Sequence, residues 1–265
     1  MDRRWADEAW QAIESRRASH VARWRERVRA LFRSEAALIS ARPGDWRRAL
    51  KNQVARWRDL LLEVWRDAAE EFGAALASKL GARLVSGRSL KAIRAEDLPQ
   101  DDDLPSWEHE PWSSRYAKRV AKLVNKKANQ IVETTRKTIS AATSLASRAG
   151  KAFTEAVSTA YQKFSRSRAQ LIADEESRQA AATAEHDAAE GAEDAGIEMT
   201  KTWISQRDDR VRSSHVRTDG ERVYLNDRFG NGLRYPKDPE GPPREVINCR
   251  CHLVWGYKPP LRKAA

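Results

Sequence analysis

The stretch WQAIESRRASHVARWRERVRALFRSEAAL (residues 10–38) decides the fold class. Positions on one stripe recur every three or four residues: Trp10, Ile13, Arg17, Val21, Trp24, Val28, Leu31, Glu35 and Leu38. All but two of them are apolar, and this spacing puts them on one helical face, so a helix is predicted over residues 5–40. Pro43 and Gly44 interrupt the pattern, and Asp45 can cap a second helix.

The same spacing continues from Trp46 and predicts a second helix that ends near Leu80. The two helices are expected to form a long antiparallel hairpin, residues 1–84, which docks on a partner. Tryptophan suits either a core or an interface, because it is large, flat and partly polar. Three of the ten tryptophans lie near helix ends or stripe edges and are predicted to contact the partner: Trp5, Trp46 and Trp65.

Residues 85–112 contain prolines and the acidic run PQDDDLPSWEHEP, and they are predicted to be a linker. A third helical region is predicted over residues 113–200, because a stripe of mostly small apolar residues keeps the helical spacing. Gly150 is a candidate joint within it, and Gly196 is a candidate C-cap at its end.

Charge is distributed unevenly along this helical region. Residues 113–168 carry thirteen Lys and Arg against two acids, whereas residues 169–200 are strongly acidic. Contact with nucleic acid or another polyanion is one interpretation, since Lys and Arg release counterions from phosphates. A solvated helix face, partly neutralised by acidic neighbours, is the other. The candidate DNA contacts are Lys118, Arg119, Lys122, Lys126, Lys127, Arg136 and Lys137.

The composition limits the classes of protein. The chain has 265 residues, of which 33% are charged and 40% hydrophobic, with a net charge of +11. No apolar run approaches the roughly 18 residues of a membrane span, and the first residues lack the apolar core of a secretory signal. We therefore expect a protein made in a cytosol, where two cysteines are not expected to form a structural disulfide.

Short turns replace long helices in the last part of the chain. TDGE (218–221) is predicted to be a tight turn between extended segments HVR and RVYL. CRCHLVWGY (249–257) alternates like a strand, with both cysteines on one face and His252 on the other. The sequence therefore predicts an α+β module over residues 201–258, followed by a basic tail, residues 259–265. The fold class expected for the whole chain is mostly α with this small module at its end. We expect the module to fold without the hairpin.

A series of motifs runs through residues 168–255 in a fixed order: IADEES (172–177), Gly196, Trp203, the run DDRVRSSH (208–215), Asp219-Gly220, Phe229, Pro236, Pro239 and NCRC (248–251). In this order the motifs resemble the phage Mu F-like minor head protein family, also called the phage head morphogenesis domain. Asp174 and Glu175 depart from the family pattern, which has Arg-Thr there, so any role of that arginine is not carried over.

The resemblance implies a structural minor head protein of a tailed phage or prophage. Such a protein is associated with the portal or capsid, and it acts in head morphogenesis and in DNA packaging or delivery. It would reside in the virion, in the capsid interior or at the portal vertex, after a period in the host cytoplasm. No membrane partner is expected.

Three interpretations remain for Cys249 and Cys251. A disulfide is disfavoured, because alternate strand residues lie about as far apart as a bridge can span. Zinc could be held by both thiolates and His215, but the C-x-C spacing is a weak signal and leaves the fourth ligand unassigned among the nearby aspartates, Asp208, Asp209 and Asp219. We favour buried thiols without a cofactor. They would lie beside a structural polar network of Asp208, Arg212, His215, Asp219 and Asn248.

Catalysis is not expected, although Asp208, Arg212, His215 and Asn248 could form a nuclease or transferase site, and related modules occur joined to toxin domains. The sequence has no phosphate-binding loop and no catalytic acids at a recognised spacing. A non-specific DNA-binding protein is the other alternative to a head component. Salt-dependent retention of DNA by residues 113–168 would favour it.

Overall fold

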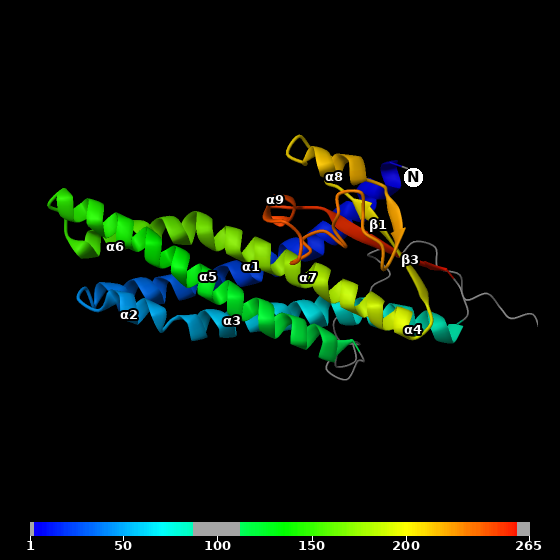
Figure 1. Cartoon of the computed structure of the whole chain (residues 1–265), viewed down its shortest axis with the longest axis horizontal. Helices are drawn as coiled ribbons and strands as arrows, with labels where there is room; N and C mark the ends of the chain where they lie inside the picture. The colour runs from blue at the N-terminus through cyan, green and yellow to red at the C-terminus, as the bar shows by residue number, and fades with distance from the viewer. Residues whose placement is uncertain (1–2, 87–111, 259–265) are drawn as a thin grey trace, which may run out of the picture. The chain divides into compact units, whose positions relative to one another are not determined.

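The computed structural model describes residues 3–86 and 112–258 (Figure 1). Helices dominate, and a small antiparallel sheet follows them, which confirms the predicted mostly α fold with an α+β module. The elements are α1 (Arg3–Ser40), α2 (Trp46–Lys51), α3 (Val54–Ala68), the π-helical turn η1 (Ala69–Ala74), α4 (Ala75–Ser86), α5 (Ser113–Arg148), α6 (Phe153–Lys163), the π-helical turn η5 (Phe164–Arg168), α7 (Ala169–Asp194), β1 (Glu198–Ile204), α8 (Ser213–Thr218), β2 (Arg222–Tyr224), α9 (Pro243–Val246) and β3 (His252–Lys258).

The predicted first helix is confirmed as α1, but the predicted second helix is divided. It is interrupted at Gln53, whose N–H donates to the Leu50 carbonyl at 2.9 Å instead of continuing the α-helical pattern. Such an i to i−3 bond tightens the last turn of a helix. A second interruption is the π-helical turn η1, after which α4 runs to Ser86.

The chain forms two compact units, each assembled from separate segments of the sequence. The helical unit comprises residues 20–65 and 119–177, and the sheet unit comprises residues 1–19, 66–118 and 178–265, as far as these are described. The units therefore differ from the sequential division at residues 84, 112 and 200. Segments far apart in sequence complete each core, a feature that composition and local spacing do not encode.

An aromatic cluster fills the centre of the helical unit. Phe32 and Trp57 are fully buried and meet edge-on, with ring centroids 5.0 Å apart. Tyr161 and Phe164 pack beside them, with their own centroids 5.1 Å apart. Large aromatic side chains bury much apolar area, so this cluster supplies a large share of the stabilisation of the bundle.

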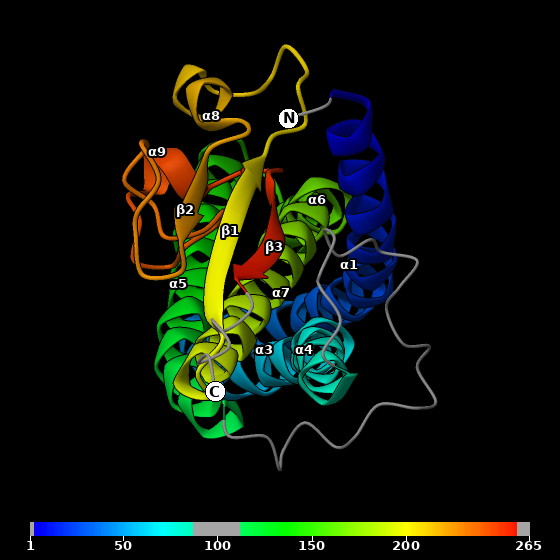
Figure 2. The same ribbon diagram turned by 90° about the vertical axis from the view of Figure 1, so that its right-hand side faces the viewer.

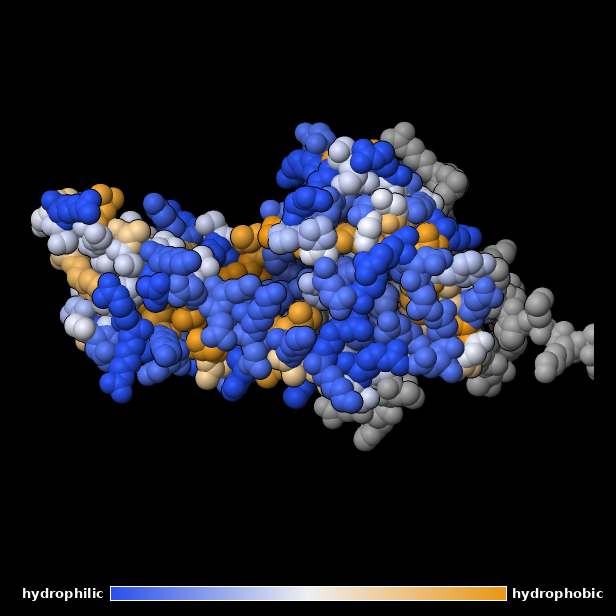
Figure 3. Space-filling model, viewed as in Figure 1, coloured by the Kyte–Doolittle hydropathy of each residue, from blue (hydrophilic) through white to orange (hydrophobic). Residues whose placement is uncertain are grey.

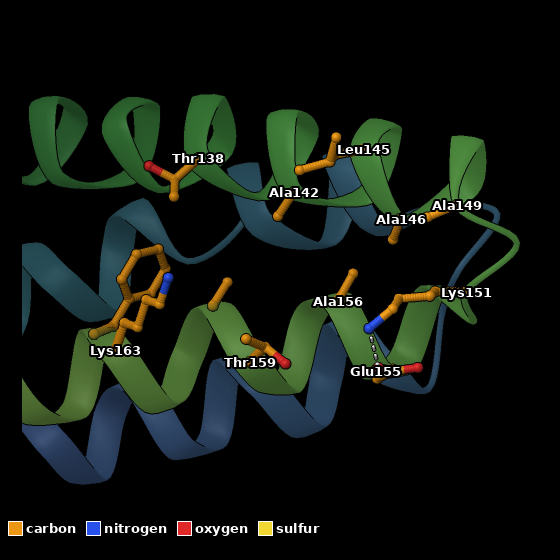
Figure 4. Close-up of a pocket in the computed structure, with 12 residues that line it drawn as sticks. Thr138, Ala142, Leu145, Ala146, Ala149, Lys151, Glu155, Ala156, Thr159 and Lys163 are labelled. Atoms are coloured by element: carbon orange, nitrogen blue, oxygen red, sulfur yellow. Dashed lines mark hydrogen bonds and ion pairs between the residues drawn. The ribbon is translucent and has the colours of Figure 1, made fainter.

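The joint predicted at Gly150 is confirmed, and the chain reverses direction there. Gly150 has φ +67°, a conformation that glycine adopts without steric cost, and Lys151 N–H donates to the Ala146 carbonyl at 2.8 Å. α5 and α6 consequently lie side by side instead of forming one continuous rod (Figure 4).

The sheet unit contains three antiparallel strands in the order β2-β1-β3 (Figure 2). α7 leads into β1 through Gly196, whose φ of +90° confirms the predicted C-cap. Trp10 and Ile13 of α1 pack against Ile204 of β1 and Val254 of β3. α1 thus covers part of the core of the sheet, which argues against the prediction that the module folds without residues 1–84.

Local structure within the module differs from the prediction at two places. The HVR segment is part of the short helix α8, whereas it was predicted to be extended. Gly220 does have the positive φ that the tight turn requires, at +83°. Both cysteines precede β3, which begins at His252, so neither is part of the strand predicted from residue 249. Before them, Asn248 has φ +58° and Cys249 N–H donates to the Val246 carbonyl, which makes a turn.

The predicted docking role of two tryptophans is contradicted by their burial. Trp46 is 4% exposed and packs near Phe153, and Trp65 is 0% exposed and donates its Nε1–H to Glu176 at 3.3 Å. Both belong to the core of the helical unit, because burial of the large apolar surface of an indole ring stabilises the fold. The remaining docking candidate, the side chain of Trp5, lies outside the described residues, as do most of the predicted linker and the basic tail.

Among the described helices, none has the length and apolar character needed to cross a membrane.

Candidate functional site

His215 lies at the centre of the candidate site, in the short helix α8. The helix begins after Arg212, whose carbonyl accepts a bond from the Val216 N–H at 2.9 Å. The side chain of His215 is 1% exposed, and its ring meets the indole of Trp203 edge-on, with centroids 5.1 Å apart. β1 and α8 thus hold the imidazole in a dry environment.

Both cysteines approach the same nitrogen of His215. The distance from His215 Nδ1 is 3.4 Å to Cys251 Sγ and 3.6 Å to Cys249 Sγ. Both cysteines are buried and free of a disulfide. Both cysteines lie before β3, and the turn at Asn248 directs Cys249 so that the two sulfur atoms reach one nitrogen.

The opposite nitrogen of His215 contacts a carboxylate. Nε2 lies 3.1 Å from Glu245 Oε2, an oxygen that also accepts a bond from Ser214 Oγ at 2.8 Å. The bond from Ser214, followed by the charge of His215, lowers the pKa of Glu245. Sequence reasoning did not identify Glu245. Its position in PREV, three residues before NCRC, was the available signal.

The two thiols differ in their tendency to ionise. A hydrogen bond from Cys251 lowers the pKa of Cys249 well below its usual range, although burial alone would raise it. The neighbouring Cys249 and burial together raise the pKa of Cys251. Two cysteine sulfur atoms and one imidazole nitrogen thus converge, a set of donors that suits soft metal ions or hydrogen bonding among themselves.

Two further residues predicted to form a structural network join the loop before α8 to the NCRC segment. Asp208 pairs with Arg250 through two bonds of 2.7 and 2.8 Å between its carboxylate and the guanidinium. Arg212 donates to the carbonyl of Ile247. With His215, these contacts fasten residues 208–215 to residues 245–251.

The other two predicted members of the network have local roles. Asp219 accepts bonds from the Ser205 N–H at 2.8 Å and from Arg207 Nε at 2.7 Å, which closes the loop between β1 and α8. Asn248 supplies the positive φ of the turn before Cys249, a conformation in which asparagine is enriched. Asp219 thus holds residues 205–207 in place, and Asn248 shapes the turn before the cysteines, as expected of residues with a structural role.

A second buried polar cluster was missed by sequence reasoning. His252 Nδ1 lies 2.7 Å from Arg17 Nη1, and Arg can only donate, so Nε2 carries the hydrogen and donates to Glu14 Oε2 at 3.0 Å. Burial lowers the pKa of His252 to about 3, with the charge of Arg17 acting in the same direction. Burial would raise the pKa of Glu14, but hydrogen bonds from Arg178 and His252 outweigh it and lower the pKa to about 2.

This second cluster joins α1, α7 and β3 within the sheet unit. His252 lies 235 positions from Arg17 and 238 from Glu14, so local spacing could not have paired them. The neutral histidine between a guanidinium and a carboxylate fits a satisfied core group rather than a catalytic base.

The predicted DNA contacts on α5 fall into exposed and engaged groups. Lys127 is engaged, because its Nζ lies 2.7 Å from Glu176 Oε1 and 5.8 Å from the centroid of the Trp65 ring. Its prediction as a DNA contact does not fit this burial and pairing. Arg136 donates two bonds of 2.7 Å to Glu133 on the surface, and Lys137 Nζ lies 3.9 Å from the same carboxylate.

The remaining basic candidates differ in exposure. Arg119 is half-buried, whereas the lysines preceding Lys127 are exposed at four-residue spacing: Lys118, Lys122 and Lys126. Side chains four positions apart lie on one face of a helix, so these three form the exposed basic stripe of α5.

A separate apolar pocket of about 390 Å³ lies between α5 and α6 in the helical unit (Figure 4). Alanine side chains, including Ala142, Ala146 and Ala156, leave this space, and Leu145 at its edge is 70% exposed. Hydrophobic residues reach the surface in this region, at the left of Figure 3. The Lys151–Glu155 ion pair borders the pocket, which offers apolar contact rather than catalytic groups.

Comparisons with known proteins place the chain among phage proteins. A family model described as "Phage Mu protein F like protein" matches residues 109–254, more than half of the chain. This confirms the resemblance predicted for residues 168–255 and extends it to include α5 and α6.

One curated relative is an NAD(+)–arginine ADP-ribosyltransferase, EFV, from Enterococcus faecalis. It is 34% identical over 79 residues, which cover 28% of this chain and 16% of that protein. The chain therefore spans about a sixth of the length of this relative. A comparison with solved structures found no match.

Proposed function

Because this chain belongs to the phage Mu protein F like family, we propose that it is a structural protein of phage head morphogenesis. The family match carries the proposal, since it extends over most of the helical region from α5 onward and over the module. The protein would act in assembly of the head of a tailed phage or prophage and would remain in the virion. Portal or capsid protein is its proposed partner, and association with the portal vertex is its proposed location.

The contacts of the motif residues support a structural role. Asp208, Arg212 and His215 each bind a group in residues 245–251, and Asp219 closes a neighbouring loop. The polar side chains of Asp208, Arg212 and His215, which a catalytic site could also use, join residues 208–215 to residues 245–251. A protein built to be a fixed part of a particle needs such contacts for stability rather than for turnover.

The test is deletion of the gene from its phage or prophage, followed by complementation. We expect the deletion to yield few DNA-filled heads under the electron microscope, with recovery when the wild-type gene is supplied. Normal numbers of filled, infectious heads in the deletion strain would contradict the proposal. Pull-down of the portal and capsid proteins encoded by the same phage would identify the partner.

Packaged double-stranded DNA is a further proposed partner, through the exposed stripe Lys118, Lys122 and Lys126. These side chains are solvent-exposed, as non-specific phosphate contacts require. The contact would be independent of base sequence and weakened by salt.

ADP-ribosyl transfer to arginine is a second candidate, because the Enterococcus faecalis relative carries that activity in its name. The match covers 16% of that protein, so most of the enzyme has no counterpart in this match. Incubation of the purified chain with NAD⁺ and an arginine-containing acceptor decides between the two. We expect no transfer above a heat-treated sample, and sustained transfer would favour the enzyme.

A further inference from the structure

We propose that His215, Cys249 and Cys251 bind a zinc ion. Their ligand atoms, Nδ1 and the two Sγ atoms, all lie within 4.8 Å of one another, and all three residues are buried. Two thiolates and an imidazole are donors that zinc prefers, and a Cys₂His set occurs in protein zinc sites. The site goes beyond the proposed head function and does not depend on it.

The spacing of the ligand atoms matches a tetrahedral ion. Zinc bonds of about 2.3 Å to sulfur and about 2.0–2.1 Å to nitrogen, at the tetrahedral angle, place S and N about 3.5 Å apart. The distances from His215 Nδ1 to the two sulfur atoms are 3.4 and 3.6 Å. An ion can therefore be accommodated without moving the histidine away from either cysteine.

Glu245 orients the histidine as a carboxylate does behind a zinc ligand. Its Oε2 lies 3.1 Å from His215 Nε2, on the opposite side of the ring from the cysteines. A proton held on Nε2 leaves the lone pair of Nδ1 directed at the sulfur atoms. Such outer carboxylates fix the tautomer and raise the basicity of the ligand. Ser214 Oγ and the ring of Trp203 hold the two partners in position.

The local backbone also favours an ion over plain packing of thiols. Alternate residues of a regular strand have Cα atoms about 6.5–7 Å apart, so their sulfur atoms do not ordinarily share one contact atom. The left-handed turn at Asn248 brings Cys249 to the nitrogen that Cys251 already contacts. Hydrophobic packing alone does not require this convergence, whereas a shared ion does.

The three residues leave one tetrahedral position without a protein ligand. Glu245 is held behind the histidine, and Asp219 is engaged by Ser205 and Arg207. Neither carboxylate therefore serves as the fourth ligand. Asp208, another earlier candidate, is paired with Arg250.

Another group of potential ligands in the same unit fits a metal less well. His186, Asp187 and Glu190 also lie close together on α7. Glu190 pairs with Arg115 at 3.1 Å, so a positive charge already neutralises it. The ring of His186 stacks on Tyr235, with centroids 4.5 Å apart. This group supplies a matched control for the zinc test.

The test begins with the wild-type full-length chain, purified without a metal-binding tag, stripped with a chelator under reducing conditions and then titrated with Zn²⁺ or Co²⁺. We expect one equivalent of Zn²⁺ to bind and to protect both thiols from a thiol reagent. Co²⁺ should give thiolate-to-metal charge-transfer absorption that one equivalent of Zn²⁺ abolishes. These readouts need no variant, so a failure of a variant to fold does not remove them.

Three variants locate the ion. His215→Asn should abolish the stoichiometric binding, and Glu245→Gln should weaken zinc affinity about 10- to 100-fold while retaining the thiolate absorption. His186→Asn should bind as the wild type does. Absence of zinc binding and of cobalt–thiolate absorption in the folded wild type would overturn the proposal. So would binding that survives in His215→Asn or is lost only in His186→Asn.

Discussion

At the scale of single residues, Glu35 carries a testable electrostatic consequence. Its carboxylate is buried in the helical unit, where it accepts bonds from Trp57 at 2.5 Å and Tyr161 at 3.3 Å. Burial disfavours its charged form and raises its pKa from 4.5 to about 7, although these two bonds oppose the shift. The folded state therefore holds the proton more tightly than the unfolded chain does, and stability falls as pH rises from about 4.5 through about 7.

Glu35→Gln should remove this dependence. We expect its stability relative to the wild type to increase by up to about 3 kcal/mol between about pH 4 and about pH 8, at roughly 1.4 kcal/mol per pKa unit. Urea unfolding at several pH values measures the difference. The exposed Glu155 provides the matched control, because Glu155→Gln removes no buried charge. An advantage of Glu35→Gln that stayed constant with pH would contradict the expectation.

Gly73 is required by close packing rather than by its backbone conformation. A Cβ at this position would lie 2.6 Å from Trp112 Cη2 and 3.2 Å from Ala184 Cβ. Trp112 is buried and its ring is rigid, so Gly73→Ala should destabilise the protein by about 1–3 kcal/mol, as overpacking does. Gly44→Ala is the control, because nothing lies within 4 Å of its added methyl group. Thermal unfolding compares them, and equal melting temperatures would refute the packing argument.

Residue-level prediction from the sequence was uneven for physical reasons. The roles of Gly150, Gly196 and Gly220 followed from local turn chemistry, and each has the positive φ expected of it. The burial of Trp46 and Trp65 was not predicted, because the sequence pattern at the edge of a helical stripe is the same whether or not another segment of the chain covers it. Glu245 was missed for the same reason, since its partner is 30 positions away.

At the scale of elements, the first half of α1 behaves as part of the sheet unit. The ring of His252 contacts Glu14 and Arg17, and the carbonyl of Arg250 accepts a bond from Trp10 Nε1. His252 and Arg250 would lose these partners without the helix. Removal of residues 1–19 should therefore expose the sheet and destabilise the module. Hydrogen exchange measures the effect: amides of β1 and β3 should lose protection in the truncated chain. Protection equal to that in the full chain would mean that the sheet does not depend on α1.

The exposed stripe of α5 has its own prediction. If Lys118, Lys122 and Lys126 contact phosphates, replacing all three with Ala should weaken binding of duplex DNA and reduce the slope of log K against log salt by about 3. The engaged Lys127 supplies the control, because Lys127→Ala removes a pair with Glu176 and should leave the salt slope unchanged. Filter binding at several salt concentrations measures both variants. An unchanged slope of log K against log salt in the triple variant would mean that these lysines do not contact DNA.

Element-level prediction succeeded where periodicity is local. α1 was predicted within a few residues of its bounds, and strand β2 lies within the segment predicted to be extended. The π-helical turns η1 and η5 were not predicted, because they insert an extra residue into a pattern that otherwise keeps its spacing. The helical conformation of residues 213–218 was missed because the segment is too short to display a period.

At the scale of the whole molecule, two units share long helices, and neither unit is a continuous stretch of sequence. The fold class was predictable from helical spacing and turn composition. The partition into units was not, since it depends on contacts such as Arg17–His252, which join positions 235 apart. The family resemblance was recognisable from the order of short motifs, and the structure gives the 208–215 run, Asp219 and NCRC a role in holding the C-terminal segments together.

The most direct test of the proposed head function is quantitative mass spectrometry of purified phage particles. We predict that the chain is present in intact heads at a reproducible copy number relative to the portal protein, and that it persists after the particles are washed in high salt. Its absence from heads, or an amount that falls to background during purification, would contradict a structural role in the head.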